Sequence, residues 1–145
     1  IMFASVKAGE LATDADYVRV ITRGLKGTNM LALPLEPKEV EAVTQYVKSL
    51  SAKWTDPSAK AGTPITAAAD PWTDEAAAVA KGKELVKAHC ASCHATADNE
   101  GTGSDSSYGF LKAPKLDKGL ALKAGDAPAD IYRVIAAGLG GTAMT

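Results

Sequence analysis

Two cysteines and a histidine stand in the order C-x-x-C-H at Cys90, Cys93 and His94. Cysteines three residues apart lie on one face of a helical turn, so both thiols can reach one edge of a porphyrin. With a histidine directly after the second cysteine, this spacing is typical of c-type haem attachment. The thiols add to the haem vinyl groups, and the imidazole binds the iron on its proximal side. The sequence therefore predicts a covalent haem at Cys90 and Cys93, with His94 as an iron ligand.

Three other kinds of site use closely spaced cysteines, and each fits this sequence less well. A thioredoxin-like redox pair needs a βαβ context, and no strand pattern surrounds Cys90. A structural zinc site needs about four ligands, whereas the chain has two cysteines and two histidines, His89 and His94. A disulfide between Cys90 and Cys93 leaves the adjacent histidine unexplained. We expect His89 to be a surface or propionate-side residue rather than a ligand.

A second signal is an internal repeat whose copies both end in methionine. Residues 16–30 read DYVRVITRGLKGTNM, and residues 130–144 read DIYRVIAAGLGGTAM. Aligned without gaps, the copies share Asp, Arg, Val, Ile, Gly, Leu, Gly, Thr and Met, which indicates duplicated structural units. Each copy predicts a short helix that stops at a left-handed glycine, Gly24 or Gly138, before a glycine-rich loop that ends in the methionine.

Two longer helices must position these motifs. Residues 36–50 carry apolar side chains at helical spacing, with acidic residues near the start and a lysine near the end. Residues 74–89 form the helix that leads into the cysteines, with Thr73 as its expected N-cap. Its expected core contacts are Val79, Leu85 and Val86.

Less regular segments connect these elements. Residues 54–73 contain three prolines and no period, which predicts a linker, and we expect Trp54 and Trp72 to tie its ends to the domains. Residues 95–109 are polar and glycine-rich, which predicts a surface loop. Three acidic residues there fit no cation-ligand spacing, so we expect them to be solvated: Asp98, Glu100 and Asp105.

Composition limits the classes of protein. The chain has 145 residues and a formal net charge of -1, which argues against a nucleic-acid partner. No apolar run approaches the roughly 20 residues that span a bilayer. Aromatic residues make up only 6% of the chain, which is few for a helical core of this length. A buried haem would fill the space that aromatic side chains otherwise occupy. The chain does not begin with Met, and its first residues lack the basic region and length of a signal peptide, so we expect a mature chain or a piece of one.

With these motifs the chain resembles the class I cytochrome c family over nearly all its length except the linker. The helix 74–89 with the C-x-x-C-H is similar to the family's first helix and haem-binding turn, and Pro114 to its proline-containing proximal segment. The loop 138–144 resembles its sixth-ligand loop, and residues 35–50 resemble its closing helix. The resemblance implies an all-α fold, with cytochrome c-like haem domains of short helices and loops around a covalently bound haem.

The resemblance also implies a role for each ligand. His94 would be the proximal ligand, and its other ring nitrogen would donate to the carbonyl of Pro114. Met144 would supply the sixth ligand, a soft thioether that raises the reduction potential. Because both axial positions are then filled, electron transfer is favoured over oxygen or peroxide chemistry. Met30 would ligate a second haem whose own C-x-x-C-H lies outside this chain.

The order of these elements is unusual, because a methionine loop and a closing helix come first. We interpret residues 1–53 as the C-terminal half of a first cytochrome c domain and 54–73 as a linker. Residues 74–145 would then be a second domain that lacks its closing helix. In the alternative, the helix 36–50 packs on the helix 74–89 to form one circularly permuted or domain-swapped haem domain. Two methionines, where one haem needs only one, count against it.

The predicted function is single-electron transfer in the periplasm or another extracytoplasmic space. The chain would be a dihaem carrier or the cytochrome subunit of a respiratory complex, and not itself an enzyme. Its partners would be redox proteins or other subunits, through which it could also associate with a membrane. One alternative is a haem domain of a catalytic dihaem enzyme, of the peroxidase or thiosulfate-oxidising type. Another is a structural haem module that docks a partner protein.

Replacing both cysteines with serine should abolish covalent haem and leave an unfolded chain, because so few aromatic residues cannot complete the core alone. Haem staining of denatured protein and circular dichroism would measure the two effects. A folded, haem-free double variant would contradict this prediction.

Overall fold

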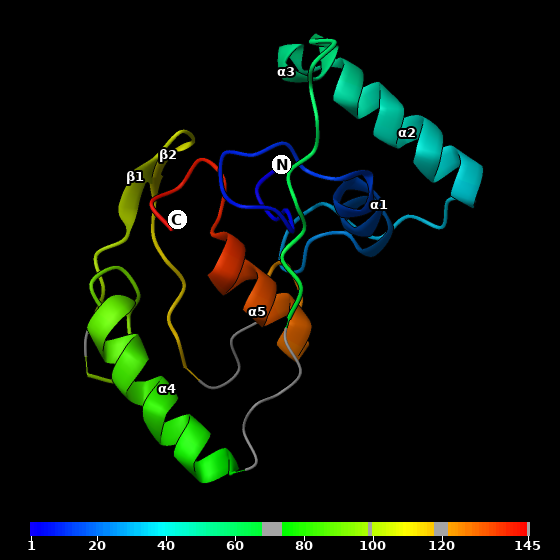
Figure 1. Ribbon diagram of the computed structural model, residues 1–145. Coiled ribbons are helices and arrows are strands. Elements are labelled where there is room, and N and C mark those ends of the chain that lie inside the picture. Colours follow the sequence, from blue (N-terminus) through cyan, green and yellow to red (C-terminus); the bar gives the residue numbers. More distant parts are fainter. Residues whose placement is uncertain (68–73, 99, 118–121, 145) are drawn as a thin grey trace. The chain divides into compact units, whose positions relative to one another are not determined.

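The computed structural model describes residues 1–67, 74–98, 100–117 and 122–144 (Figure 1). Within these ranges the helices are α1 (Asp14–Arg23), α2 (Pro37–Ser49), α3 (Ala52–Thr55), α4 (Glu75–His89) and α5 (Pro128–Ala137). The strands β1 (Ser104–Ser106) and β2 (Gly109–Leu111) form an antiparallel hairpin. The expected all-α class is confirmed, because the strands described are only three residues long. None of the described helices is long and apolar enough to cross a membrane.

The chain forms two compact units. Unit 1 comprises residues 1–67 and 121–145, and unit 2 comprises residues 68–120. Both copies of the internal repeat therefore belong to unit 1, although most of the chain lies between them. The C-x-x-C-H belongs to unit 2.

The hairpin corrects the expectation of an irregular loop over residues 95–109. Asp105 pairs with Phe110, and Ser106 pairs with Gly109. Strands of three residues are too short for an alternating apolar pattern to be recognised, so no strand was predicted in this segment. Within the described ranges the hairpin has no βαβ crossover, so the context that a thioredoxin-like site needs is not formed there.

Capping residues explain where the helices begin. In α1, the Thr13 hydroxyl accepts from the Asp16 amide at 3.2 Å, while the Asp16 carboxylate accepts from the Thr13 amide at 3.0 Å. Proline at the first turn starts α2 and α5. The expected cap of α4, Thr73, is wrong: that residue lies outside the described ranges, and Asp74 accepts from Ala77 instead, at 3.1 Å. Thr and Asp are both good caps, so the sequence does not decide between neighbours.

Both repeat helices end at glycine, as predicted. Gly24 has φ 64° and ψ -165°, and Gly138 has φ 72° and ψ -174°. The positive φ is confirmed, but ψ places both residues in a region that only glycine adopts readily rather than in the left-handed helical region. A Cβ on Gly24 would also overlap the carbonyl oxygen of Met30, so the loop closes against this glycine.

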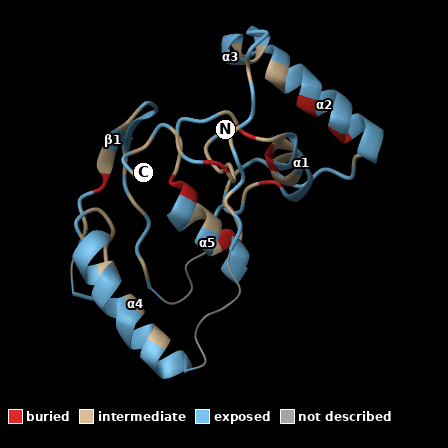
Figure 2. Ribbon diagram, viewed as in Figure 1, coloured by how far each residue is buried: buried red, intermediate tan, exposed pale blue. Residues whose placement is uncertain are grey.

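A buried carboxylate lies at the centre of unit 1. Few of the described residues are buried (Figure 2), and the buried hydrophobic ones are Val6, Ala12, Val40 and Ala137. Asp16 is fully buried and accepts from the amide of Ser5 at 2.8 Å, from the Ser5 hydroxyl at 3.0 Å and from the Thr13 hydroxyl at 2.9 Å. Arg19 pairs with it at 2.7 Å. Burial raises the pKa of Asp16, but the hydrogen bonds from Thr13, Arg19 and Ser5 outweigh burial and hold it below its usual value.

The start of the predicted linker is attached to unit 1. The Trp54 indole donates to the Tyr17 hydroxyl at 3.1 Å, and the Ile65 amide donates to the Ser5 carbonyl at 2.7 Å. This confirms the expected role of Trp54. Trp72 lies outside the described residues.

In unit 2, α4 presents its apolar side chains to solvent. Val79 is 65% exposed and Leu85 47% exposed, while Val86 is half-buried. The prediction that Val79 and Leu85 are core contacts is therefore wrong for this unit. Among the described residues of unit 2 there is no second helix that could cover this face.

Replacing Asp16 with Asn should lower the free energy of unfolding by about 3 kcal/mol, because Arg19 would keep a mostly buried charge without its partner. Chemical denaturation followed by circular dichroism measures this loss. Glu84→Gln is the matched control, since its carboxylate is 73% exposed and pairs at the same i,i+3 spacing with Lys81, which is 55% exposed. There we expect a loss of at most about 1 kcal/mol. Equal losses at the two positions would contradict a central role for Asp16.

The acid stability of the protein should depend on the same carboxylate. Because the folded pKa of Asp16 lies below the unfolded one, its contribution is fully present above the unfolded pKa of about 4. It is lost as the pH falls through the lower folded pKa. Below about pH 4 the unmodified protein should therefore lose stability more steeply than Asp16→Asn in acid titrations, and parallel curves would contradict this.

Candidate haem-binding site

The C-x-x-C-H residues form a tight turn at the end of α4. The Cys90 amide donates to the Val86 carbonyl at 2.9 Å and closes the last turn of the helix. The amides of Cys93 and His94 then both donate to the Cys90 carbonyl, at 3.2 and 2.9 Å. Both cysteines are half-buried free thiols, so they form no disulfide with each other. The turn thus carries two thiols and an imidazole within five residues, as the spacing predicted.

The His94 ring is fixed by a backbone carbonyl. Its Nδ1 lies 2.8 Å from the carbonyl oxygen of Pro114, which confirms the contact that the resemblance implied. A carbonyl oxygen can only accept, so Nδ1 carries a proton, and in the neutral tautomer Nε2 is then the nitrogen with a lone pair for a metal. Metal-binding histidines are oriented by this arrangement, which also raises the basicity of the ligating nitrogen. Free thiols and an unprotonated Nε2 are the groups that a covalent haem requires, so the residues fit this cofactor.

A glycine segment that the sequence reasoning missed packs against the turn. The Gly103 amide donates to the Cys93 carbonyl at 3.1 Å. Gly101 has φ +62°, and a Cβ there would overlap the backbone of Cys93, His94 and Ala95. The glycines were visible in the sequence inside the predicted surface loop, but a glycine-rich loop does not reveal which backbone it contacts.

The two methionine loops have the same hydrogen-bond pattern. In the first, the Leu25 amide donates to the Met30 carbonyl at 2.8 Å. The Thr28 hydroxyl donates to the Leu25 carbonyl at 2.8 Å and accepts from the Met30 amide at 3.1 Å. In the second, the equivalent bonds measure 2.6, 2.9 and 3.1 Å and join Leu139, Thr142 and Met144. The sequence repeat is therefore a structural repeat.

The structure groups the predicted site residues within the two units. Cys90, Cys93, His94 and Pro114 come together in unit 2, while Met30 and Met144 belong to unit 1. Met30 is 40% exposed, and Met144 is half-buried. His89 is exposed, in agreement with its expected place at the surface. Over the described residues, no group of three or more His, Cys, Asp or Glu side chains could hold a metal ion.

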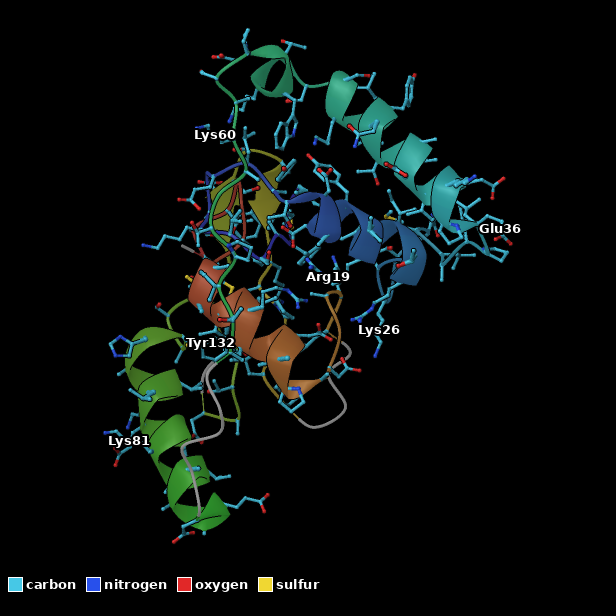
Figure 3. All side chains as sticks on the ribbon, turned by 45° about the vertical axis from the view of Figure 1, so that its right-hand side comes forward. Arg19, Lys26, Glu36, Lys60, Lys81 and Tyr132 are labelled. Atoms are coloured by element: carbon cyan, nitrogen blue, oxygen red, sulfur yellow. The ribbon has the colours of Figure 1, made fainter. Side chains whose placement is uncertain are left out.

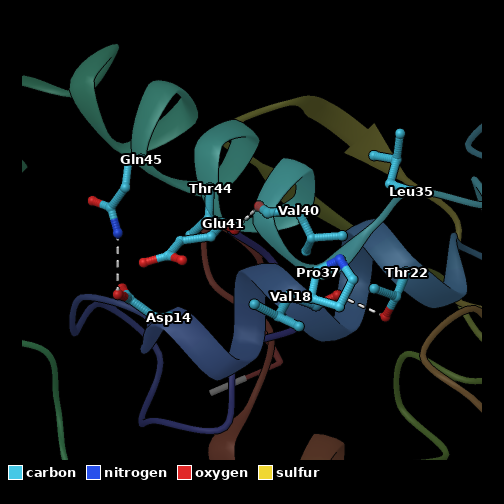
Figure 4. Close-up of a pocket in the computed structure, with 9 residues that line it drawn as sticks. All are labelled: Asp14, Val18, Thr22, Leu35, Pro37, Val40, Glu41, Thr44 and Gln45. Carbon is cyan, nitrogen blue, oxygen red and sulfur yellow. Dashed lines mark hydrogen bonds between the residues drawn. The ribbon is translucent and has the colours of Figure 1, made fainter.

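A pocket of about 440 Å³ lies between α1 and α2 in unit 1 (Figure 4). Apolar side chains of both helices and of the segment between them line much of it: Val18, Leu35, Pro37 and Val40. Polar side chains line the rest, and among them Gln45 donates to Asp14 at 3.4 Å. The pocket gives the first repeat copy an apolar surface next to the helix that carries its methionine loop.

Comparison with known proteins agrees with these features. Residues 77–145 match the family described as cytochrome C oxidase, cbb3-type, subunit III. The structure is similar to a chain of the Kuenenia stuttgartiensis reducing HAO-like protein complex, with a TM-score of 0.83 and 25% sequence identity. The similarity covers 99% of this chain and 67% of that chain. No curated protein sequence matches the chain.

The family match begins inside α4, contains the C-x-x-C-H turn and extends through the second methionine loop. The structural similarity extends the same fold over nearly the whole chain. A cytochrome c domain implies covalently bound haem c and haem-based electron transfer. The motif, the His94 geometry and the family match thus agree that residues 77–145 resemble a c-type cytochrome domain, and the chain has a cytochrome c-like, mostly helical fold.

Proposed function

We propose that this chain carries single electrons through a haem attached at Cys90 and Cys93, with His94 as the proximal ligand and Met144 as the sixth ligand. The observation that carries the proposal is the 2.8 Å contact from His94 Nδ1 to the Pro114 carbonyl. It orients the ring and selects the tautomer whose Nε2 can bind iron, which is the arrangement that an iron ligand needs.

The chemistry of the side chains favours a carrier over an enzyme. When bound, the haem supplies an iron that changes between Fe(II) and Fe(III) by one electron. The sulfurs of Cys90 and Cys93, as thioethers to the haem, would hold the ring in both oxidation states, and the imidazole of His94 would contribute electron density. A thioether from Met144 stabilises Fe(II) and raises the potential. With both axial positions filled by side chains, no position is left for a substrate.

The loop geometry supports Met144 as a ligand. Backbone and threonine hydrogen bonds hold both ends of the loop, so the position of Met144 relative to α5 is well defined. A ligand held in this way loses little conformational entropy when it binds.

The first methionine loop supports a second haem. Met30 sits in a loop with the same hydrogen bonds, and we propose that it ligates a haem whose C-x-x-C-H lies outside this chain. Exposed apolar side chains of unit 1 and the pocket between α1 and α2 offer apolar surface for such a group: Leu31, Leu33, Val43, Val47 and Leu50. Residues 1–53 would then belong to a first haem domain and residues 74–145 to a second, with 54–73 linking them. An intact mass combined with an iron assay tests this, because one haem in a stably folded 145-residue chain favours the permuted or swapped alternative.

The comparisons support a role beside partner subunits. The similar structure comes from a multi-protein complex, and the matching family is described as an oxidase subunit. We therefore propose that the chain passes electrons to or from other subunits of a respiratory or oxidoreductase complex. Covalent haem attachment further supports a place in the periplasm or an equivalent space. Co-purification from the native source would test the association.

Met144→Ala should open the sixth position and lower the reduction potential, because the soft thioether that stabilises Fe(II) is lost. Redox titration and the near-infrared band of Met–S ligation measure the two effects. Met2→Ala is the control, because Met2 lies outside both copies of the repeat and has no repeat partner. An unaltered spectrum in Met144→Ala would show that Met144 is not the ligand. In a separate test, binding of cyanide or peroxide to the unmodified protein would favour a catalytic haem over an electron carrier.

Gly101→Ala should destabilise the haem-binding turn more than Gly109→Ala. Both residues have positive φ, at +62° and +89°, so each substitution carries a backbone strain of about 1–3 kcal/mol. Only at Gly101 does the added Cβ also overlap the backbone of the turn, whereas at Gly109 it meets nothing within 4 Å. Thermal unfolding and the yield of covalent haem measure the difference. Equal effects would mean that the glycine segment does not support the turn.

A further inference from the structure

The segment that precedes each repeat helix contacts the other copy of the repeat at or near its methionine loop. The segment before α1 bonds to the end of α5 and to the loop that follows: the Ala8 amide donates to the Ala137 carbonyl at 2.8 Å, and the Gly140 amide to the Met2 carbonyl at 3.4 Å. The segment before α5 contacts the other loop in return, because the Lys26 amide donates to the Lys123 carbonyl at 3.3 Å. Each methionine loop is therefore in contact with the segment that precedes the other repeat helix.

Charged side chains strengthen one half of this arrangement. Lys26 lies in the first methionine loop, and its ammonium group pairs with the carboxylate of Asp126 directly before α5 (Figure 3). The other oxygen of Asp126 accepts from the Leu122 amide at 3.0 Å. The bond from Lys26 also holds the pKa of Asp126 below its usual value. One turn further on, Asp130 lies 3.7 Å from Arg23 at the end of α1.

These contacts connect the first loop to the second through a rigid element. Asp126 lies two residues before α5, Asp130 in the first turn of α5 lies 3.7 Å from Arg23, and α5 ends at Gly138, where the loop to Met144 begins. A helix of ten residues transmits a displacement of its start to its end, since its backbone bonds resist bending. A change in the Lys26 loop therefore reaches the Met144 loop.

We propose that the two methionine loops form one cooperative unit, in which Lys26, paired with Asp126, is a positioning residue for Met144. The inference rests on the proposed role of Met144 as sixth ligand. It adds that iron ligation at one loop depends on the integrity of the other, which lies more than a hundred residues away in the sequence. A protein with haem at both loops would then have coupled reduction potentials.

Charge reversal tests the pair, because a neutral variant of an exposed ion pair would change little. Lys26→Asp places two carboxylates together and should raise amide hydrogen exchange at Leu139 and Gly140 by roughly five- to tenfold. It should also weaken the near-infrared Met–S band and lower the denaturant concentration at which that band is lost. The exchanged pair Lys26→Asp with Asp126→Lys should restore both readouts. Lys38→Asp, which makes the same charge change on α2, should alter neither.

The outcomes separate this inference from the function on which it rests. A Met–S band with unchanged exchange and unchanged denaturant dependence in Lys26→Asp would overturn the coupling of the loops. Failure of the charge-exchanged variant to recover would do the same, because it would mean that the pair itself is not responsible. Absence of the Met–S band from the unmodified protein would overturn the role of Met144, while hydrogen exchange would still test the contact between the loops.

Discussion

A buried carboxylate organises the larger of the two units. Asp16 has no exposed surface, and it collects donors from three places in the chain: Ser5, Thr13 and Arg19. Arg19 in turn donates to the Phe3 carbonyl at 2.6 Å, so the same network fixes the N-terminal segment on α1. Because few apolar side chains of the described residues are buried, this polar network supplies part of the stability that a hydrophobic core supplies in most small domains.

The second copy of the repeat contains an equivalent aspartate–arginine pair in α5. Asp130 occupies the equivalent position in α5 and pairs with Arg133 at 2.8 Å, just as Asp16 pairs with Arg19. Each helix then ends at a glycine and delivers a methionine through an identical set of loop bonds. The contacts between the two copies and the segments before them hold both loops in one unit.

The grouping of the reactive side chains in the haem-binding turn was predicted correctly from the sequence. Cys90, Cys93 and His94 are neighbours in the chain, so their grouping follows from the helical turn alone. The family resemblance supplied the Pro114 contact, which local spacing does not reveal because Pro114 lies twenty positions after His94 in the chain. The role of Gly101 was not predicted, since the approach of one backbone to another is a property of the folded loop rather than of residue type.

The sequence by itself determined the local features: the attachment motif, the duplicated helix and loop, and the glycines that end both helices. These follow from spacing and backbone preference within a few residues. Tertiary structure alone decided the rest. It buried Asp16, left Val79 and Leu85 exposed on α4, and joined Lys26 to Asp126 across a hundred residues of sequence. Each of these depends on which distant segment covers a side chain, and amphipathic spacing shows only that a face needs covering, not what covers it.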